Sequence, residues 1–255
     1  MHRIIAVLEN TFKEALRQRI LLLLVVFAVL LIIISIFMEP FALGEAPKIM
    51  RDLGLAATSL FGVLTTIIIG SALIHKDIEK KTIYTVLSKP VRRSEIILGK
   101  FLGLSALVFV LVLAMLIIHQ LVLFVSEGVF DLRLLISFPF TMLEVMVLLG
   151  ILLLFSAFSS TTMTSIMGVI FFVIGHAMPD LKLFADQAKT PVLKTIAYAF
   201  YYILPNLENF NLRIDLTYGL PLHADQLTFS VLYGIVYIIF LLFLTQLVFE
   251  RREFK

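Results

Sequence analysis

Residues 101–125 read FLGLSALVFVLVLAMLIIHQLVLFV, and this run contains no aspartate, glutamate, lysine or arginine. An α-helix rises about 1.5 Å per residue, so a run of this length can cross the ~30 Å hydrocarbon core of a bilayer. A helix that is apolar on every side is buried in a large core or in lipid. The stretch predicts a transmembrane helix.

The composition of the whole chain agrees with that prediction. Of its 255 residues, 60% are hydrophobic and 15% are charged, and the mean hydropathy is +1.05. An average soluble domain has about 25% charged residues. The absence of cysteine excludes disulfides, thiolate metal ligands and a cysteine nucleophile. We predict an all-α polytopic membrane protein, and we read the net charge of +3 as a guide to topology, with no nucleic acid as partner.

Six apolar runs are predicted to be transmembrane helices within one membrane domain of residues 1–255. The fifth is the shortest, and only Ser159-Ser160-Thr161-Thr162 separates it from the fourth, so we interpret these two as a tight hairpin. If the N-terminus is cytoplasmic, two thirds of the lysines and arginines fall on the cytoplasmic side, as the positive-inside bias requires. Both termini are therefore expected in the cytoplasm. The runs are residues 20–38, 53–74, 101–125, 134–158, 163–178 and 227–249.

Two amphipathic stretches are expected to lie on the membrane surface. In residues 2–18, Ile5, Leu8, Phe12 and Leu16 repeat at helical spacing, which favours an interfacial helix over a plain extension of the first span. The external segment 179–226 contains a second apolar stripe at 192–204, which ends at a proline and is too short to cross. We predict a short outer-leaflet helix there.

The loop at residues 76–100 is densely charged between two apolar runs. It is either a solvated linker that enforces topology or a structured docking element. Pro90 ends a helix-compatible stretch, and Ser94 offers an N-cap for a new helix that continues into the third span. A short helix, a break and a second helix would form a rigid knob suited to a soluble partner.

The residues of this loop resemble the first cytoplasmic loop of ABC type-2 permeases. The resemblance rests on the order Glu79, Thr82, Leu87-Ser88, Pro90-Val91, Arg93 and Gly99-Lys100. The six-span topology, the N-terminal interfacial helix and the external amphipathic segment are also similar, so the resemblance extends over the whole chain. One departure is Lys81, where the family commonly has glycine.

The resemblance implies that the loop is a coupling helix seated in a groove of a separate ABC ATPase subunit. ATP and Mg would then be bound by that partner, because this sequence has no G-x-x-x-x-G-K-[ST] phosphate loop and is not expected to be an enzyme. It further implies a prokaryotic cytoplasmic (inner) membrane, contact with lipid, and a dimer with a second permease subunit, identical or not. The implied coupling residues are Glu79, Thr82, Ile83, Val86, Leu87, Ser88, Pro90, Arg92 and Arg93.

Three ionisable residues fall inside predicted spans, where such groups usually face the bundle interior or a water-filled path. His119 and Glu144 lie at similar depth in the third and fourth spans and could pair with one another. The pair would be either an interhelical packing bond or a substrate contact or proton relay. His176, near the outer end of the fifth span, is expected at the membrane interface. No metal-binding or hydrolase motif occurs in the sequence.

Two functions fit this pattern. The first is a permease subunit that couples ATP hydrolysis in a partner to export of a substrate. The second keeps the same fold but transmits ATP-driven motion to a periplasmic partner protein. A membrane enzyme or scaffold outside the ABC class has little support, and the sequence does not name a substrate.

Overall fold

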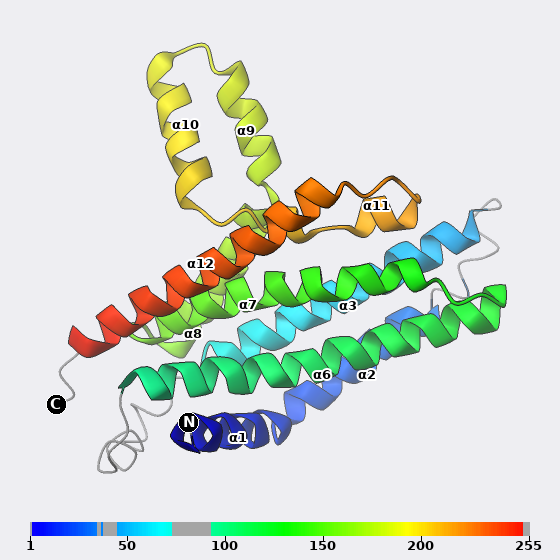
Figure 1. The fold of residues 1–255 in the computed structure, drawn as a ribbon, viewed down its shortest axis with the longest axis horizontal. Coiled ribbons are helices and arrows are strands. Elements are labelled where there is room, and N and C mark those ends of the chain that lie inside the picture. Colours follow the sequence, from blue (N-terminus) through cyan, green and yellow to red (C-terminus); the bar gives the residue numbers. More distant parts are fainter. Residues whose placement is uncertain (1, 35–36, 38–44, 73–92, 252–255) are drawn as a thin grey trace.

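The computed structural model describes residues 2–34, 37, 45–72 and 93–251, and these ranges contain helices, turns and loops but no strand. Figure 1 shows a bundle of long helices with a helical hairpin projecting from it. The α-helices are α1 (His2–Leu16), α2 (Arg19–Ile34), α3 (Ala46–Gly70), α6 (Arg93–Glu127), α7 (Ser137–Ser156), α8 (Thr161–His176), α9 (Met178–Gln187), α10 (Pro191–Ile203), α11 (Arg213–Thr217) and α12 (Ala224–Arg251), and the 3-10 helices are η2 (Leu132–Ile136) and η3 (Leu207–Phe210).

Four helical segments within the described ranges are long and apolar enough to cross a membrane: α3, α6, η2 with α7, and α12. A fifth candidate exists if α8 and α9, which are bent by 56° relative to each other, count as one span. The predicted runs 20–38 and 163–178 correspond to α2 and α8, which have 16 residues each. These two helices are shorter than the ~20 residues of a full crossing. The all-helical class is confirmed, with four or five candidate spans.

Helix α7 lies at the centre of the bundle and packs against α3, α6, α8 and α12. Leu148, Leu149 and Leu152 of α7 are fully buried. The outer faces of the neighbouring helices carry large exposed apolar side chains, including Ile117 on α6 and Ile239 on α12. This arrangement, apolar inside and outside, is that of a bundle whose solvent is lipid.

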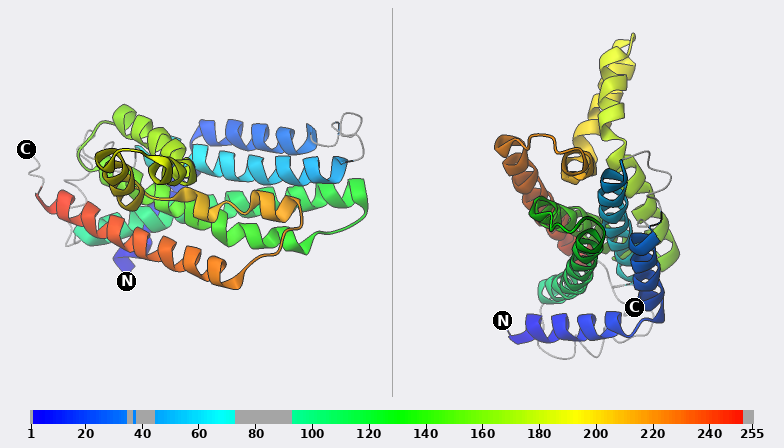
Figure 2. Two further views of the ribbon diagram at one scale, coloured as in Figure 1. Left: turned by 90° about the horizontal axis from the view of Figure 1, so that it is seen from above. Right: turned by 90° about the vertical axis from the view of Figure 1, so that its right-hand side faces the viewer.

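Helix α1 lies crosswise to the bundle and packs on the first turns of α6 (Figure 2, right). Two glycines of α6 allow the contact: a Cβ at Gly103 would lie 2.7 Å from the backbone oxygen of Leu8, and one at Gly99 would lie 2.6 Å from Cβ of Val7. Thr11 is buried in this contact face. The predicted apolar stripe is therefore only partly used for packing, and its members Ile5 and Leu16 stay exposed.

Polar contacts fasten both ends of the bundle. At one end the Arg93 guanidinium donates to the backbone oxygens of Phe249 (2.7 Å) and Glu250 (3.0 Å), so the start of α6 holds the end of α12. At the other end Arg51 of α3 contacts Glu127 (3.0 Å), the last residue of α6, and Asp131 (2.9 Å) in the loop that follows it. The start of α1 and the end of α12 therefore lie at the same end of the bundle.

Helices α9 and α10 form a hairpin that leaves the bundle sideways (Figure 2, right). Each begins with a proline in its first turn, Pro179 and Pro191, where the missing N–H costs nothing. The Tyr198 hydroxyl donates to the Asp186 carboxylate and joins the two helices. The predicted outer helix at 192–204 corresponds to α10, whereas α9 was not predicted.

Candidate functional site

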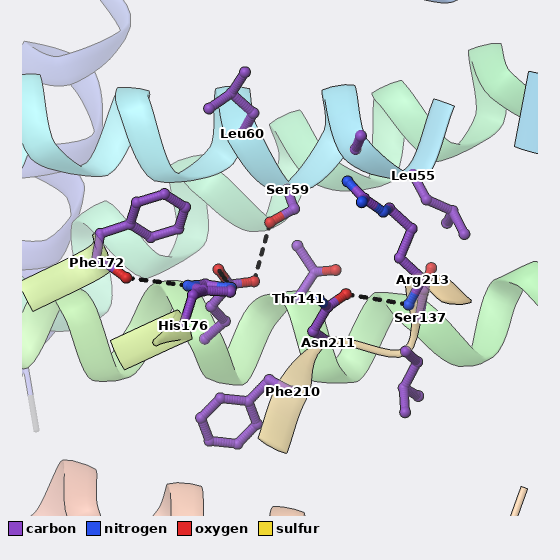
Figure 3. A pocket seen from close by; sticks show the side chains of 13 residues that line it. Leu55, Ser59, Leu60, Ser137, Thr141, Phe172, His176, Phe210, Asn211 and Arg213 are labelled. Atoms are coloured by element: carbon purple, nitrogen blue, oxygen red, sulfur yellow. Dashed lines mark hydrogen bonds and ion pairs between the residues drawn. The ribbon is translucent and has the colours of Figure 1, made fainter. Parts of the chain in front are cut away.

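A cavity of about 320 Å³ lies where α3, α7, α8 and the segment after η3 meet. Figure 3 shows side chains from all four elements pointing into this space. The lining combines apolar walls with hydroxyl, amide, imidazole and carboxylate groups. The lining residues are Leu55, Ala56, Ser59, Leu60, Ser137, Thr141, Glu144, Phe172, His176, Phe210, Asn211, Leu212 and Arg213.

Helical spacing explains how these residues come to share one cavity. Ser137, Thr141 and Glu144 stand at positions i, i+4 and i+7 of α7, which form one face of a helix. Phe172 and His176 are likewise four residues apart on α8. The side of α7 that faces the cavity is thus polar, whereas α8 contributes one aromatic ring and one imidazole.

Glu144 is the buried acid of the cavity, with only 3% of its surface exposed. The Ser59 hydroxyl donates to its Oε2 atom over 3.1 Å. Its Oε1 atom has no hydrogen-bond donor among the described residues. Nε2 of His176 lies 3.5 Å from Oε1, which is too long for a well-formed hydrogen bond.

His176 stands between two carboxylates. Its Nδ1 atom lies 3.1 Å from the backbone oxygen of Phe172, and because a carbonyl oxygen only accepts, Nδ1 must carry the proton. Its Nε2 atom faces Oε1 of Glu144 at 3.5 Å and Oε2 of Glu208 at 3.9 Å.

Gly175 allows η3 to pack closely against α8, since a Cβ there would lie 2.6 Å from Cγ of Leu207.

The far side of the cavity is held by Asn211 and Arg213. The Asn211 side chain donates to Glu208 over 2.9 Å and accepts from the Arg213 backbone N–H over 3.2 Å. The Arg213 guanidinium lies 2.9 Å from Asp52 of α3. Within the described ranges no cluster of three histidine, aspartate or glutamate side chains has the geometry of a metal site. The cavity offers charge, hydrogen bonding and aromatic surface to a ligand.

The predicted pairing of His119 with Glu144 does not form. Nε2 of His119 lies 3.2 Å from the backbone oxygen of Met50, against α3 at Gly54, and no residue in the described part of the chain hydrogen-bonds to its Nδ1 atom. Equal depth in two helices fixes height along the bundle but not the direction in which each side chain points. Glu144 faces α3 and α8 instead, so its partners are Ser59 and His176.

The sequence analysis did not predict that Ser59 and His176 would contact Glu144, or that Glu208 would approach His176. His176 was expected at the interface because it ends an apolar run, and it is indeed partly exposed, with 27% of its side chain accessible. Its position one α8 turn after Phe172 was a usable signal for a shared face. Nothing in the sequence indicated that Glu208, about thirty residues further on, would return to it.

Of the implied coupling residues, Glu79, Thr82, Ile83, Val86, Leu87, Ser88, Pro90 and Arg92 lie outside the described residues. Arg93 is described and begins α6. Its contacts with the backbone of α12 give it a structural role at the end of the bundle where the loop joins.

Comparison with known proteins gives one clear result. The family model described as ABC-2 family transporter protein matches residues 5–254. No curated protein matches the sequence. Because the family match covers residues 5–254 of 255, the chain belongs to the ABC-2 transporter family.

Proposed function

We propose that this chain is the membrane-spanning permease subunit of an ABC exporter, driven by ATP hydrolysis in a separate nucleotide-binding subunit. The observation that carries the proposal is the family match over residues 5–254, in a bundle with a buried polar cavity. In this proposal α2 and α8 complete a set of six spans. Two permease subunits and two ATPase subunits form the working complex in the prokaryotic inner membrane, with both termini in the cytoplasm.

Helix α6 is suited to carry motion from the ATPase to the cavity. It is the longest helix of the described chain, with 35 residues, and it begins directly after the proposed coupling segment. It packs against α1, α2, α3, α7 and α12, so a displacement at its start acts on most of the bundle. Arg93 transmits such a displacement to α12 through its two backbone contacts.

The test is a purification of the chain together with the ABC ATPase encoded beside it. Leu87→Asp and Glu79→Ala should release the ATPase subunit or uncouple its activity, because a docking helix needs its apolar face and its fixed polar contact. Lys89→Ala is the matched control, since charges at the rim of an interface steer assembly more than they add affinity. Wild-type pull-down and ATPase activity for both Leu87→Asp and Glu79→Ala would refute the proposal.

A further inference from the structure

We propose that the cavity around Glu144 is a binding site for a protonated amine, with the Glu144 carboxylate as its counter-ion. The identification of that amine as transported cargo rests on the proposed function. The binding itself rests on the charge, hydrogen bonding and shape of the cavity.

The first argument is the charge of Glu144. An ionised carboxylate inside a membrane bundle is costly unless a positive group or several donors compensate it. Glu144 is 3% exposed and receives one hydrogen bond, from Ser59. Its Oε1 atom is buried without a donor among the described residues, and Glu144 is one of the residues that line the cavity. The missing partner is a cationic donor.

The second argument is that the surrounding side chains do not supply that donor. With Nδ1 of His176 donating to the Phe172 oxygen, the neutral imidazole turns a lone pair at Nε2 toward Glu144. A protonated imidazole would add one positive charge but would share it with Glu208 as well. The Arg213 guanidinium is directed to Asp52. With both carboxylates ionised, the group of Glu144, His176 and Glu208 is net negative in either state of the histidine.

The third argument is the fit of an ammonium group to the acceptors. An ammonium has three N–H donors and no acceptor. The cavity is lined by Glu144, His176 and Thr141, and a carboxylate, a neutral imidazole and a hydroxyl can each accept a hydrogen bond. Ammonium is thus complementary to the site in both charge and donor count, whereas a carboxylate or phosphate would meet a like charge.

The fourth argument is the apolar part of the wall. The rings of Phe172 and Phe210 line the same space, and aromatic faces attract cations within about 6 Å. Leu55 and Leu60 give room for a small hydrocarbon body next to the charged group. A cavity of about 320 Å³ therefore suits an amine with a compact apolar group.

The experiment measures thermal unfolding of the full permease–ATPase complex in lipid nanodiscs with 2-phenylethylamine as the probe and 2-phenylethanol as its uncharged analogue. The amine should raise the Tm of the wild type in a saturable manner, and the alcohol should not. Glu144→Gln, which keeps the shape and removes the charge, should weaken amine binding at least about tenfold, as loss of one member of a buried charge pair does. Glu250→Gln, at the exposed end of α12, is the matched control and should bind like the wild type.

Three outcomes would overturn the proposal. They are equal stabilisation by amine and alcohol, undiminished amine binding by Glu144→Gln, and stabilisation by lowered pH alone, which would mean a proton site. If Glu144→Gln does not fold, Thr141→Val replaces it, and unchanged amine affinity in that variant counts against the site. A failed amine test with an intact ATPase pull-down rejects only the ligand, so the two proposals fail separately.

Discussion

At the scale of single residues, Gly54 shows how closely α3 and α6 approach. A Cβ at this position would lie 2.1 Å from Nε2 of His119, whose side chain is fully buried and bonded to the Met50 oxygen. The imidazole therefore has no room to move without losing that contact. Gly54→Ala is expected to lower the free energy of unfolding by about 1–3 kcal/mol, the usual cost of overpacking. Equilibrium unfolding with SDS in mixed micelles would measure it.

The control for this prediction is Gly62→Ala on the same helix. A Cβ there would lie 3.4 Å from Cγ2 of Val112, which is an ordinary contact. This variant should therefore unfold at the same SDS concentration as the wild type or at a slightly higher one. His119→Ala combined with Gly54→Ala removes the clashing ring, and the two changes should be non-additive. If the effects of Gly54→Ala and His119→Ala on the free energy of unfolding simply add, or if Gly54→Ala and Gly62→Ala lower it equally, α3 and α6 are not in close contact at Gly54.

The residues around the cavity mark the limit of prediction from the sequence. That Glu144 must face the interior followed from the cost of a carboxylate in lipid, and the structure buries it. Its partners did not follow, because they depend on the rotation of α7 about its axis and on the return of η3 to the end of α8. Long-range packing of this kind leaves no local trace in the sequence.

At the scale of elements, the packing of α1 against α6 depends on small residues, as close contacts between helices in membranes generally do. A Cβ at Gly103 would lie 2.7 Å from a backbone atom, the Leu8 oxygen, so the helices must separate to admit it. Gly103→Ala is expected to loosen α1 and to speed tryptic cleavage after Arg17 in nanodiscs. Gly62→Ala should leave the cleavage rate unchanged, and an unchanged rate for Gly103→Ala would contradict the glycine contact.

Helices were more predictable than their ends. Hydropathy located an apolar helix at each predicted run that the structure describes. The length and apolar character of a lipid-facing helix depend on consecutive residues, so the local sequence is enough to predict it. The breaks between helices were harder to predict: η2 precedes α7, and the chain bends by 56° between α8, which ends at His176, and α9, which begins at Met178. Pro179 was a visible signal for a new helix start, but the predicted external segment was read without α9.

The hairpin of α9 and α10 has an apolar face that touches little else in the described chain. Leu183, Ile196 and Phe200 are exposed on it, while tyrosines gather nearby, a combination that favours the headgroup region of a membrane. Since the protein has no cysteine, single labels are easy to place. A fluorophore on Ile196→Cys should be quenched by a lipid-attached nitroxide, and one on Lys194→Cys, on the opposite face, should be quenched less. Equal weak quenching at both positions would indicate a hairpin standing free in water.

At the scale of the whole molecule, the two ends of the bundle differ in charge. The segments expected on the cytoplasmic side, residues 1–19, 76–100 and 250–255, contain 14 of the 21 lysines and arginines, and the other side contains seven. Basic residues are retained on the cytoplasmic side of membrane proteins. We therefore expect the end of the bundle at which the start of α6 meets the end of α12 to face the cytoplasm.

This orientation predicts a pattern of thiol labelling in intact cells. A membrane-impermeant maleimide added from outside should label Asp225→Cys at the start of α12 and should not label Glu250→Cys at its end until the cells are permeabilised. The two sites flank the same helix of 28 residues, so each is the control for the other. An even number of crossings places both ends of the chain on the same side of the membrane. A cysteine at Glu9 in α1 should therefore also escape labelling from outside. Labelling of Glu250→Cys from outside would invert the proposed topology, and with it the placement of the ATPase-binding loop, because that loop joins the bundle beside the end of α12 through Arg93.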